Sequence, residues 1–174
     1  MVDCKGYLLP LTLIVRFKKK EFTYKTQGKV AKMATKYGDP INSLTRMLRS
    51  ELGEHLIPVE DFVDMFTENG VMEFPYSPEG RIQKLEGHDA MKDYFEHVRD
   101  LIAISDMMNL QTYISQDGKN AIVEFACQGE VVATGRPYNQ KYVSVISLSE
   151  GKISRYRDYW NPLVLINALK DENV

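Results

Sequence analysis

The feature that most constrains the fold is a change in the spacing of apolar residues near Met108. Before this point apolar side chains recur every three or four residues, as on one face of an α-helix. After it they alternate with polar side chains, as in half-buried β-strands. Helices followed by a run of neighbouring strands predict an α+β fold. We expect a cone, in which a curved antiparallel sheet wraps around the N-terminal helices.

Capping and turn residues divide the chain into elements. Helices are predicted over residues 40–52, 58–66, 88–102 and 162–169, with a turn at 67–70. Strands are predicted at about 71–76, 110–116, 120–134, 140–149 and 152–160. Asp39-Pro40 reads as an N-cap followed by proline at the first helical position, and Gly53 as the end of that helix. Asp117-Gly118 and Glu150-Gly151 predict tight turns between strands.

Charge divides the 174 residues into two parts. Residues 1–38 hold nine Lys and Arg against two acidic residues, a net charge of +7, and the remainder carries −9. We therefore predict a basic N-terminal extension over 1–38 and one α+β domain over 39–174. The extension lacks regularly interleaved aromatic residues, so we expect a solvated segment and no nucleic-acid binding; an added strand or a partner contact are the alternatives.

Several classes of protein do not fit the sequence. The apolar run over residues 7–15 is far shorter than the roughly 20 residues of a membrane span, so we expect no membrane partner. The two cysteines, Cys4 and Cys127, fit no disulfide framework or metal spacing, which favours a reducing, cytoplasmic location. Asp93 and His97 have i, i+4 spacing but lack a third ligand, so we predict no metal site. No phosphate-binding glycine motif is present, and we expect no cofactor.

Three segments resemble the nuclear-transport-factor-2-like superfamily. They are Phe62-Val-Asp-Met-Phe-Thr-Glu-Asn-Gly-Val-Met-Glu-Phe-Pro75, Leu85-Glu-Gly-His-Asp-Ala-Met91, and the last two strands, from Lys141 to Asn161. Within that superfamily the chain is most similar to the SnoaL-like polyketide cyclases and the phenazine-biosynthesis A/B proteins. The resemblance covers about residues 40–170 and implies a cystatin-like cone with a cavity on the concave face of its sheet. One such fold hosts many activities, so it does not by itself give the reaction.

Asp158 is the first candidate for a catalytic residue. Alternation in the last strand divides its side chains between two faces. The face that carries Asp158 also carries Ser154, Tyr156 and Trp160, and the opposite face carries Arg155, Arg157 and Tyr159. A carboxylate among aromatic rings is partly desolvated, which raises its pKa toward neutrality and suits a proton shuttle. The resemblance implies the same role, because the catalytic acid/base of the SnoaL-like cyclases falls at this position. The alternative is an ion pair with an arginine of a neighbouring strand.

Glu124 and Tyr94 are the next candidates. Glu124 stands in the middle of an otherwise apolar strand, where a carboxylate is costly to bury, and the resemblance places a glutamate of the phenazine A/B proteins there. Its alternative is a solvent-facing strand residue. Tyr94 lies on the apolar face of the third helix, where the phenazine A/B proteins carry a pocket histidine. A tyrosine there keeps a hydrogen-bonding tip but does not titrate near neutrality.

The remaining lining of the pocket is predicted from alternation and aromatic content. We expect a largely apolar cavity for a small hydrophobic molecule, lined by Tyr156, Trp160, Tyr142, Ser144, Ile146, Phe62, Phe66, Phe74 and Tyr76. The alternative for any one of these residues is the ordinary core.

Ketosteroid isomerases share the fold, but their three catalytic positions fall here on Phe74, Ser144 and about Ser50, so that mechanism is not expected.

These observations predict a cofactor-free cyclase, dehydratase or isomerase that acts on a small hydrophobic or aromatic carbonyl compound. Asp158 would move the proton, and Tyr156, Tyr142 or Tyr94 would hydrogen-bond the oxygen that gains charge. A non-catalytic binding protein with the same cavity is the alternative. An interaction domain without a cavity is the third possibility. A homodimer through the outer face of the sheet is compatible with all three.

Overall fold

The computed structural model describes residues 38–170. The basic extension predicted over 1–38 lies outside the described residues except for Gly38, so its role stays a prediction. Helices α2 (Pro40–Leu52), α3 (Gly87–Leu101) and α4 (Pro162–Leu169) accompany a six-stranded sheet, with short 3₁₀ helices at Gly53–His55 and Val63–Met65. The strands are β1 (Phe66–Glu73), β2 (Lys84–Glu86), β3 (Ile102–Ile114), β4 (Asn120–Val131), β5 (Gln140–Ser149) and β6 (Lys152–Trp160).

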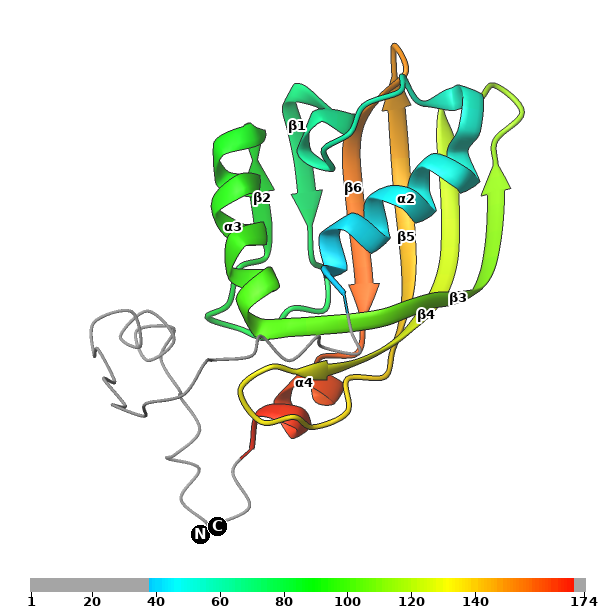
Figure 1. The fold of residues 1–174 in the computed structure, drawn as a ribbon. Helices are drawn as coiled ribbons and strands as arrows, with labels where there is room; N and C mark the ends of the chain where they lie inside the picture. Colours follow the sequence, from blue (N-terminus) through cyan, green and yellow to red (C-terminus); the bar gives the residue numbers. More distant parts are fainter. Residues whose placement is uncertain (1–37, 171–174) are drawn as a thin grey trace, which may run out of the picture. The chain divides into compact units, whose positions relative to one another are not determined.

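The sheet is curved and open, and its strand order is β2-β1-β6-β5-β4-β3 (Figure 1). Strands β3 to β6 pair antiparallel, as predicted, whereas β1 runs parallel to β6. Figure 1 shows α2 lying across the concave face and α3 beside β1 and β2. The predicted α+β fold with N-terminal helices inside a curved sheet is therefore confirmed.

Helix α2 begins and ends where its capping residues predict. The Asp39 carboxylate accepts hydrogen bonds from the backbone N–H groups of Ile41 (2.8 Å) and Asn42 (3.2 Å), and Pro40 needs no such partner. Gly53 ends the helix with a positive φ of 49°, which glycine adopts without steric cost. The apolar stripe that includes Leu48 is buried against the sheet, which holds the helix inside the curve.

The helix predicted over 58–66 and the turn predicted at 67–70 are both wrong. The structure has one 3₁₀ turn at Val63–Met65, and the chain then enters β1 directly at Phe66. Phe66 pairs with Ile153 of β6, and the regular register resumes at Val71 after an irregularity. A helix this short gains little from propensity alone, so burial of its apolar residues in the sheet decides the conformation.

Strand β3 starts at Ile102, about eight residues earlier than predicted, at the end of α3. Its pairing with β4 shifts register twice, between Ile104 and Asp106 and between Met108 and Gln111, and Asn109 has a φ of 56°. Such bulges bend a strand and break its alternation. The period of two is therefore hidden in the sequence until the second bulge has passed. The three-residue strand β2 is too short to show a period, and we did not predict it.

The C-terminal elements match their predictions closely. Strands β5 and β6 and helix α4 occupy the expected ranges, and Glu150 and Gly151 form the tight turn between the two strands with φ values of 52° and 73°. The turn at Asp117-Gly118 is longer than two residues. The Ser115 N–H bonds the Asn120 carbonyl (2.8 Å), so all the residues between these two belong to the turn. In the part of the chain that is described, no helix is long and apolar enough to cross a bilayer.

The main core lies between the helices and the concave face of the sheet. Phe62, Phe66 and Tyr156 are its largest fully buried side chains and meet edge to face or tilted, with ring centroids 5.4–6.2 Å apart. Phe62 also contacts Phe95 of α3 at 5.0 Å. This aromatic cluster joins β1, β6 and α3, and two of its members, Phe95 and Tyr156, line the cavity described next.

Candidate active site

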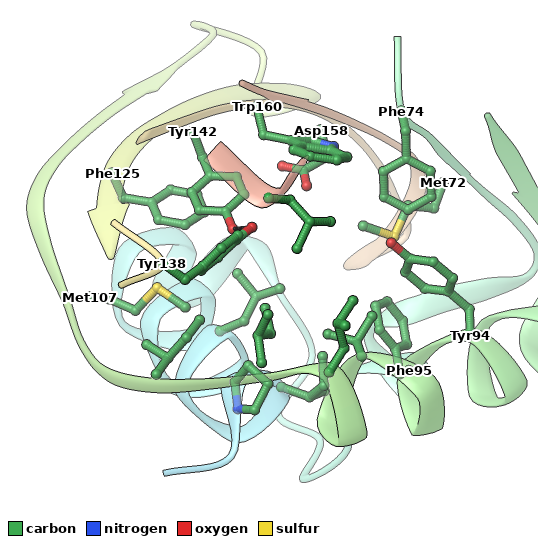
Figure 2. A pocket seen from close by; sticks show the side chains of 18 of the residues that line it. Met72, Phe74, Tyr94, Phe95, Met107, Phe125, Tyr138, Tyr142, Asp158 and Trp160 are labelled. Carbon is green, nitrogen blue, oxygen red and sulfur yellow. Dashed lines mark hydrogen bonds between the residues drawn. The ribbon is translucent and has the colours of Figure 1, made fainter. Parts of the chain in front are cut away.

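A cavity of about 120 Å³ lies on the concave face of the sheet, between α2, α3 and α4. Nearly all its lining side chains are apolar or aromatic (Figure 2), among them Met72, Phe74, Tyr94, Phe95, Met107, Phe125, Tyr138, Tyr142, Tyr156 and Trp160. Ligand sites are commonly about 300 Å³ or larger. This volume is closer to the roughly 150 Å³ of an apolar cavity that accepts benzene. The cavity therefore has room for about one ring.

Asp158 is the only carboxylate among the described residues that line this cavity. It stands on β6 between Tyr156 and Trp160, and all three point to the concave side, as alternation predicts. In Figure 2 the Asp158 carboxylate reaches into the space between Tyr142 and Phe74. The ion pair with arginine that was the alternative is not formed by Asp158 in residues 38–170.

A chain of hydroxyl groups holds one oxygen of the carboxylate. The Ser144 hydroxyl donates to Asp158 Oδ1 at 3.3 Å, and the Tyr156 hydroxyl lies 2.6 Å from Ser144 Oγ. Because Ser144 has one hydrogen and gives it to Asp158, Tyr156 is the donor to Ser144. Ser144 and Tyr156 are fully buried. No donor in the described chain is bonded to the second carboxylate oxygen, which leaves it for a ligand in the cavity.

Burial raises the pKa of Asp158 to about 7, and the hydrogen bond from Ser144 opposes part of that rise. The cause is desolvation, since an apolar site disfavours the charged form of a carboxyl group. With a pKa near 7, the group is present in both its acid and its base form at neutral pH. This is the property that general acid–base catalysis requires.

Tyr94 of α3 also lines the cavity, and its hydroxyl points inward in Figure 2. Its ring packs against Phe74 and Phe95, with centroids 5.1 and 5.3 Å apart. Burial and the nearby Asp158 carboxylate raise its pKa well above the ordinary value, so the hydroxyl stays protonated and can act only as a neutral hydrogen-bonding group.

Glu124 does not reach the cavity. On β4 the buried side chains are those of Val123 and Phe125, whereas Glu124 is exposed on the outer face of the sheet. The solvent-facing alternative is the one that the structure shows. Phe125, which follows Glu124 in the sequence, lines the cavity instead and stacks on Tyr142 with ring centroids 4.7 Å apart.

The predicted pocket residues fall into three groups. Tyr142, Tyr156, Trp160 and Phe74 line the cavity. Ser144, Ile146, Phe62 and Phe66 are buried in the core beside it, and of these Ser144 reaches the cavity group through its bond to Asp158. Tyr76 is 61% exposed and packs edge to face on Tyr159, on the outer face of the sheet. Tyr76 follows the end of β1, so the alternation of that strand no longer directs its side chain.

Tyr138 is one of the cavity residues that sequence reasoning missed. It lies in the connection between β4 and β5, outside any periodic segment, and is 4% exposed. Its hydroxyl lies 2.8 Å from the hydroxyl of Tyr142. A backbone bond from the Tyr138 N–H to the Gly129 carbonyl (2.7 Å) carries the loop back over β4. The spacing of apolar residues in the sequence could not predict this contact, because Tyr138 lies outside any helix or strand.

Residues 38–170 offer no cluster of three or more metal-ligating side chains. His97 bonds the backbone carbonyl of Asp93 at 2.6 Å and not its carboxylate, so the two do not form a chelating pair. Burial raises the pKa of the Cys127 thiol to about 11, which keeps it protonated near neutrality and unsuited to act as a nucleophile.

The outer face of the sheet carries the residues predicted to lie opposite Asp158. Arg155 makes two bonds to the Glu73 carboxylate, at 2.7 and 3.0 Å. Apolar side chains are substantially exposed on this face, among them those of Tyr113, Ile122 and Val143. The homodimer through this face stays a prediction.

Comparison with known proteins supports the resemblance. Residues 46–156 match the model of the SnoaL-like domain. The "Uncharacterized protein YesE" of Bacillus subtilis is 44% identical over 110 residues, covering 63% of this chain and 75% of that protein. An uncharacterized PhzA/B-like protein of Pseudomonas aeruginosa is 34% identical over 106 residues, covering 61% of this chain and 74% of that protein.

Solved structures agree on the fold. A crystal structure named "Putative Isomerase from Bacillus subtilis" is 40% identical, with a TM-score of 0.60 over 71% of this chain and 84% of that one. A phenazine biosynthesis-related protein from Pseudomonas aeruginosa is 18% identical, with a TM-score of 0.55 over 76% of this chain and 90% of that one. At that identity the likeness concerns the fold alone.

Proposed function

Because the chain belongs to the SnoaL-like domain family, whose fold hosts different activities, we propose a function from the residues in its cavity. We propose that this protein is an acid–base enzyme that moves a proton on a small hydrophobic carbonyl compound, with Asp158 as the group that accepts and returns the proton. The net reaction would be an isomerisation, a cyclisation or a dehydration.

One observation carries the proposal: the Asp158 carboxylate lies in a cavity lined by apolar and aromatic side chains. One of its oxygens accepts a hydrogen bond from Ser144, and the other is left to face a ligand. A structural carboxylate in such a place would be expected to have an arginine or lysine partner, because an unpaired buried charge is costly. Within residues 38–170, Asp158 has only a hydroxyl partner, that of Ser144. Its pKa of about 7 is the consequence, and this pKa is costly for stability but useful for proton transfer.

The chemical step needs no further reactant. The free oxygen of Asp158 takes a proton from the carbon beside the carbonyl, so a C–H bond breaks as an O–H bond forms. The electron pair of that C–H bond moves into the enolate, with its charge on the carbonyl oxygen. The Asp158 carboxyl then returns the proton. In an isomerisation the proton goes to another carbon, and in a dehydration it goes to the leaving oxygen. In a cyclisation the enolate carbon attacks a second carbonyl carbon, and the proton goes to the oxygen of that carbonyl. Tyrosine hydroxyls that line the same cavity, kept neutral by their raised pKa, are the candidate donors for the developing charge.

Proton abstraction can be measured without knowledge of the natural substrate. Cyclohexanone is a one-ring ketone, and in D₂O an enzymatic base exchanges the protons beside its carbonyl for deuterium, which NMR follows directly. We expect exchange well above the buffer rate, and we expect Asp158→Asn to lower it by about 10²–10⁴-fold, the usual contribution of a positioned general base. The rate should rise with pH and level off above about 7, where the carboxylate is formed.

Asp100→Asn is the matched control, because Asp100 is exposed on α3 and outside the cavity lining. It should exchange at the wild-type rate. Equal rates for wild type and Asp158→Asn would remove Asp158 from the chemistry. Saturable binding of the ketone without exchange would favour the non-catalytic binding protein.

A further inference from the structure

Two tyrosine hydroxyls meet inside the cavity. Tyr142 reaches it from β5 and Tyr138 from the loop between β4 and β5, and their oxygens lie 2.8 Å apart. Figure 2 shows the two hydroxyls together, on the side of the cavity away from Tyr94. Stacking of Tyr142 on Phe125 fixes the ring of Tyr142. Packing therefore fixes the Tyr142 side of the pair, and the backbone bond from the Tyr138 N–H to the Gly129 carbonyl holds the other side.

The hydrogens of this pair can be counted. Each hydroxyl carries one hydrogen, and the bond between the two oxygens uses one of the two. One O–H hydrogen is left. The Cys127 thiol beside Tyr142 is only a weak acceptor, and the Gln140 side-chain oxygen beside Tyr138 already accepts from the N–H groups of Lys141 and Asn161. Neither neighbour therefore offers this hydrogen a strong acceptor. A phenolic O–H normally finds a partner when it is buried. The hydroxyl that keeps this hydrogen also accepts the bond from the other tyrosine. That accepted bond polarises it and makes it a better donor to a ligand.

The pair lies close to the proposed proton-transfer group. Burial is the main cause that raises the pKa of both Tyr138 and Tyr142, and the negative charge of Asp158 adds a small further rise. Both hydroxyls therefore stay protonated at neutral pH. A ligand that fills the cavity between them and Asp158 would have to be small, because the volume of about 120 Å³ has room for about one ring.

We propose that the Tyr138–Tyr142 hydroxyl pair binds the carbonyl oxygen of the substrate, and that the substrate is a single-ring compound whose carbonyl stands next to an acidic C–H. This inference rests on the proposed function in one respect: the proposed function supplies the carbonyl group whose oxygen the pair would bind. The remaining O–H hydrogen donates to the carbonyl in the ground state and to the enolate oxygen as Asp158 removes the proton. Larger fused-ring carbonyl compounds do not fit the cavity.

Two probes of the same shape separate oxygen recognition from cavity filling. Cyclohexanone and methylenecyclohexane each have one six-membered ring, but only the ketone has an oxygen. In NMR titrations, the double variant Tyr138→Phe/Tyr142→Phe should bind cyclohexanone about tenfold more weakly, the effect of one lost hydrogen bond, while its affinity for methylenecyclohexane changes less than about twofold. Each single variant keeps one hydroxyl with a free hydrogen and should lose less than the double variant.

The controls make the outcome decisive. Tyr113→Phe removes an exposed hydroxyl on the outer face that bonds Gln111, and it should change neither affinity. Unchanged ketone affinity in the double variant would overturn the inference. An equal loss of affinity for both probes would also overturn it, and so would failure of the wild type to bind cyclohexanone. It is likewise overturned if Tyr94→Phe, and not the pair, removes ketone recognition.

The two proposals fail separately. If the double variant loses ketone affinity but Asp158→Asn exchanges protons at the wild-type rate, the hydroxyl pair stands and the catalytic role of Asp158 falls. If Asp158→Asn loses exchange while the double variant binds the ketone normally, the reverse holds.

Discussion

Replacing Asp158 with Asn should change how the stability of the protein depends on pH. The carboxyl group has an ordinary pKa of 3.8, and burial raises it to about 7 in the folded protein. Between these values the native state holds a proton that the unfolded chain has released. Stability therefore falls as pH rises through this range, and it is highest, as far as this group is concerned, below pH 3.8. Asn does not titrate, so its variant lacks this dependence.

The magnitude follows from the two pKa values. A tenfold change in proton affinity corresponds to about 1.4 kcal/mol, so moving the pKa from 3.8 to about 7 costs about 4 kcal/mol of stability at alkaline pH. Much of this loss falls in a range that is convenient to measure. Between pH 5 and pH 8, the unfolding free energy of Asp158→Asn should rise relative to the wild type by about 3 kcal/mol.

Urea unfolding at pH 5, 6, 7 and 8 measures this difference. The hydrogen bond from Ser144 has an acceptor in both proteins, because the Asn side-chain oxygen can replace Oδ1. Other titrating groups are common to both proteins and cancel in the difference. Asp100→Asn, exposed on α3, should run parallel to the wild type. A constant difference between Asp158→Asn and the wild type across this pH range would refute the reasoning, since it would mean that Asp158 titrates alike in the folded and unfolded chains.

Three other substitutions test neighbouring features. Ser144→Ala removes the donor that lowers the pKa of Asp158, so the pH profile of proton exchange on the ketone should move to higher pH. The Tyr156 hydroxyl also loses its acceptor, so the free energy of unfolding in urea should fall by about 1–3 kcal/mol. A profile that stays in place would contradict the role of Ser144. Gly129→Ala would press a methyl group against the backbone carbonyl of Ala103 and should lower stability by about 2–3 kcal/mol; wild-type stability would contradict that packing. If the predicted homodimer forms through the outer face, Ile122→Lys should sediment as a monomer and the wild type as a dimer; a monomeric wild type would end that prediction.

The parts of the fold that were predictable are those governed by neighbours in the sequence. Asp39, Pro40 and Gly53 bound α2 because capping and positive φ act over a few residues. Strand β5 and the part of β6 after its register shift keep a regular alternation, so the face of Asp158 followed from it. The N-terminal half of β3 was not predictable, because two register shifts that depend on its partner β4 interrupt the pattern.

The same division holds within the candidate site. Alternation alone placed Asp158 with Tyr156 and Trp160. It did not say which face of β4 the curved sheet would turn inward, and that choice made Phe125 a cavity residue and Glu124 an exposed one.

The contacts that complete the site come from the tertiary structure. Ser144 and Asp158 meet because they lie opposite each other in the pairing of β5 with β6, and Tyr138 meets Tyr142 because a loop returns over β4. The sequence by itself determined which side chains share a strand face, since a fully extended backbone alternates. Only the tertiary structure decided the register, the curvature and the loop path, because these depend on packing between segments that are distant in the chain.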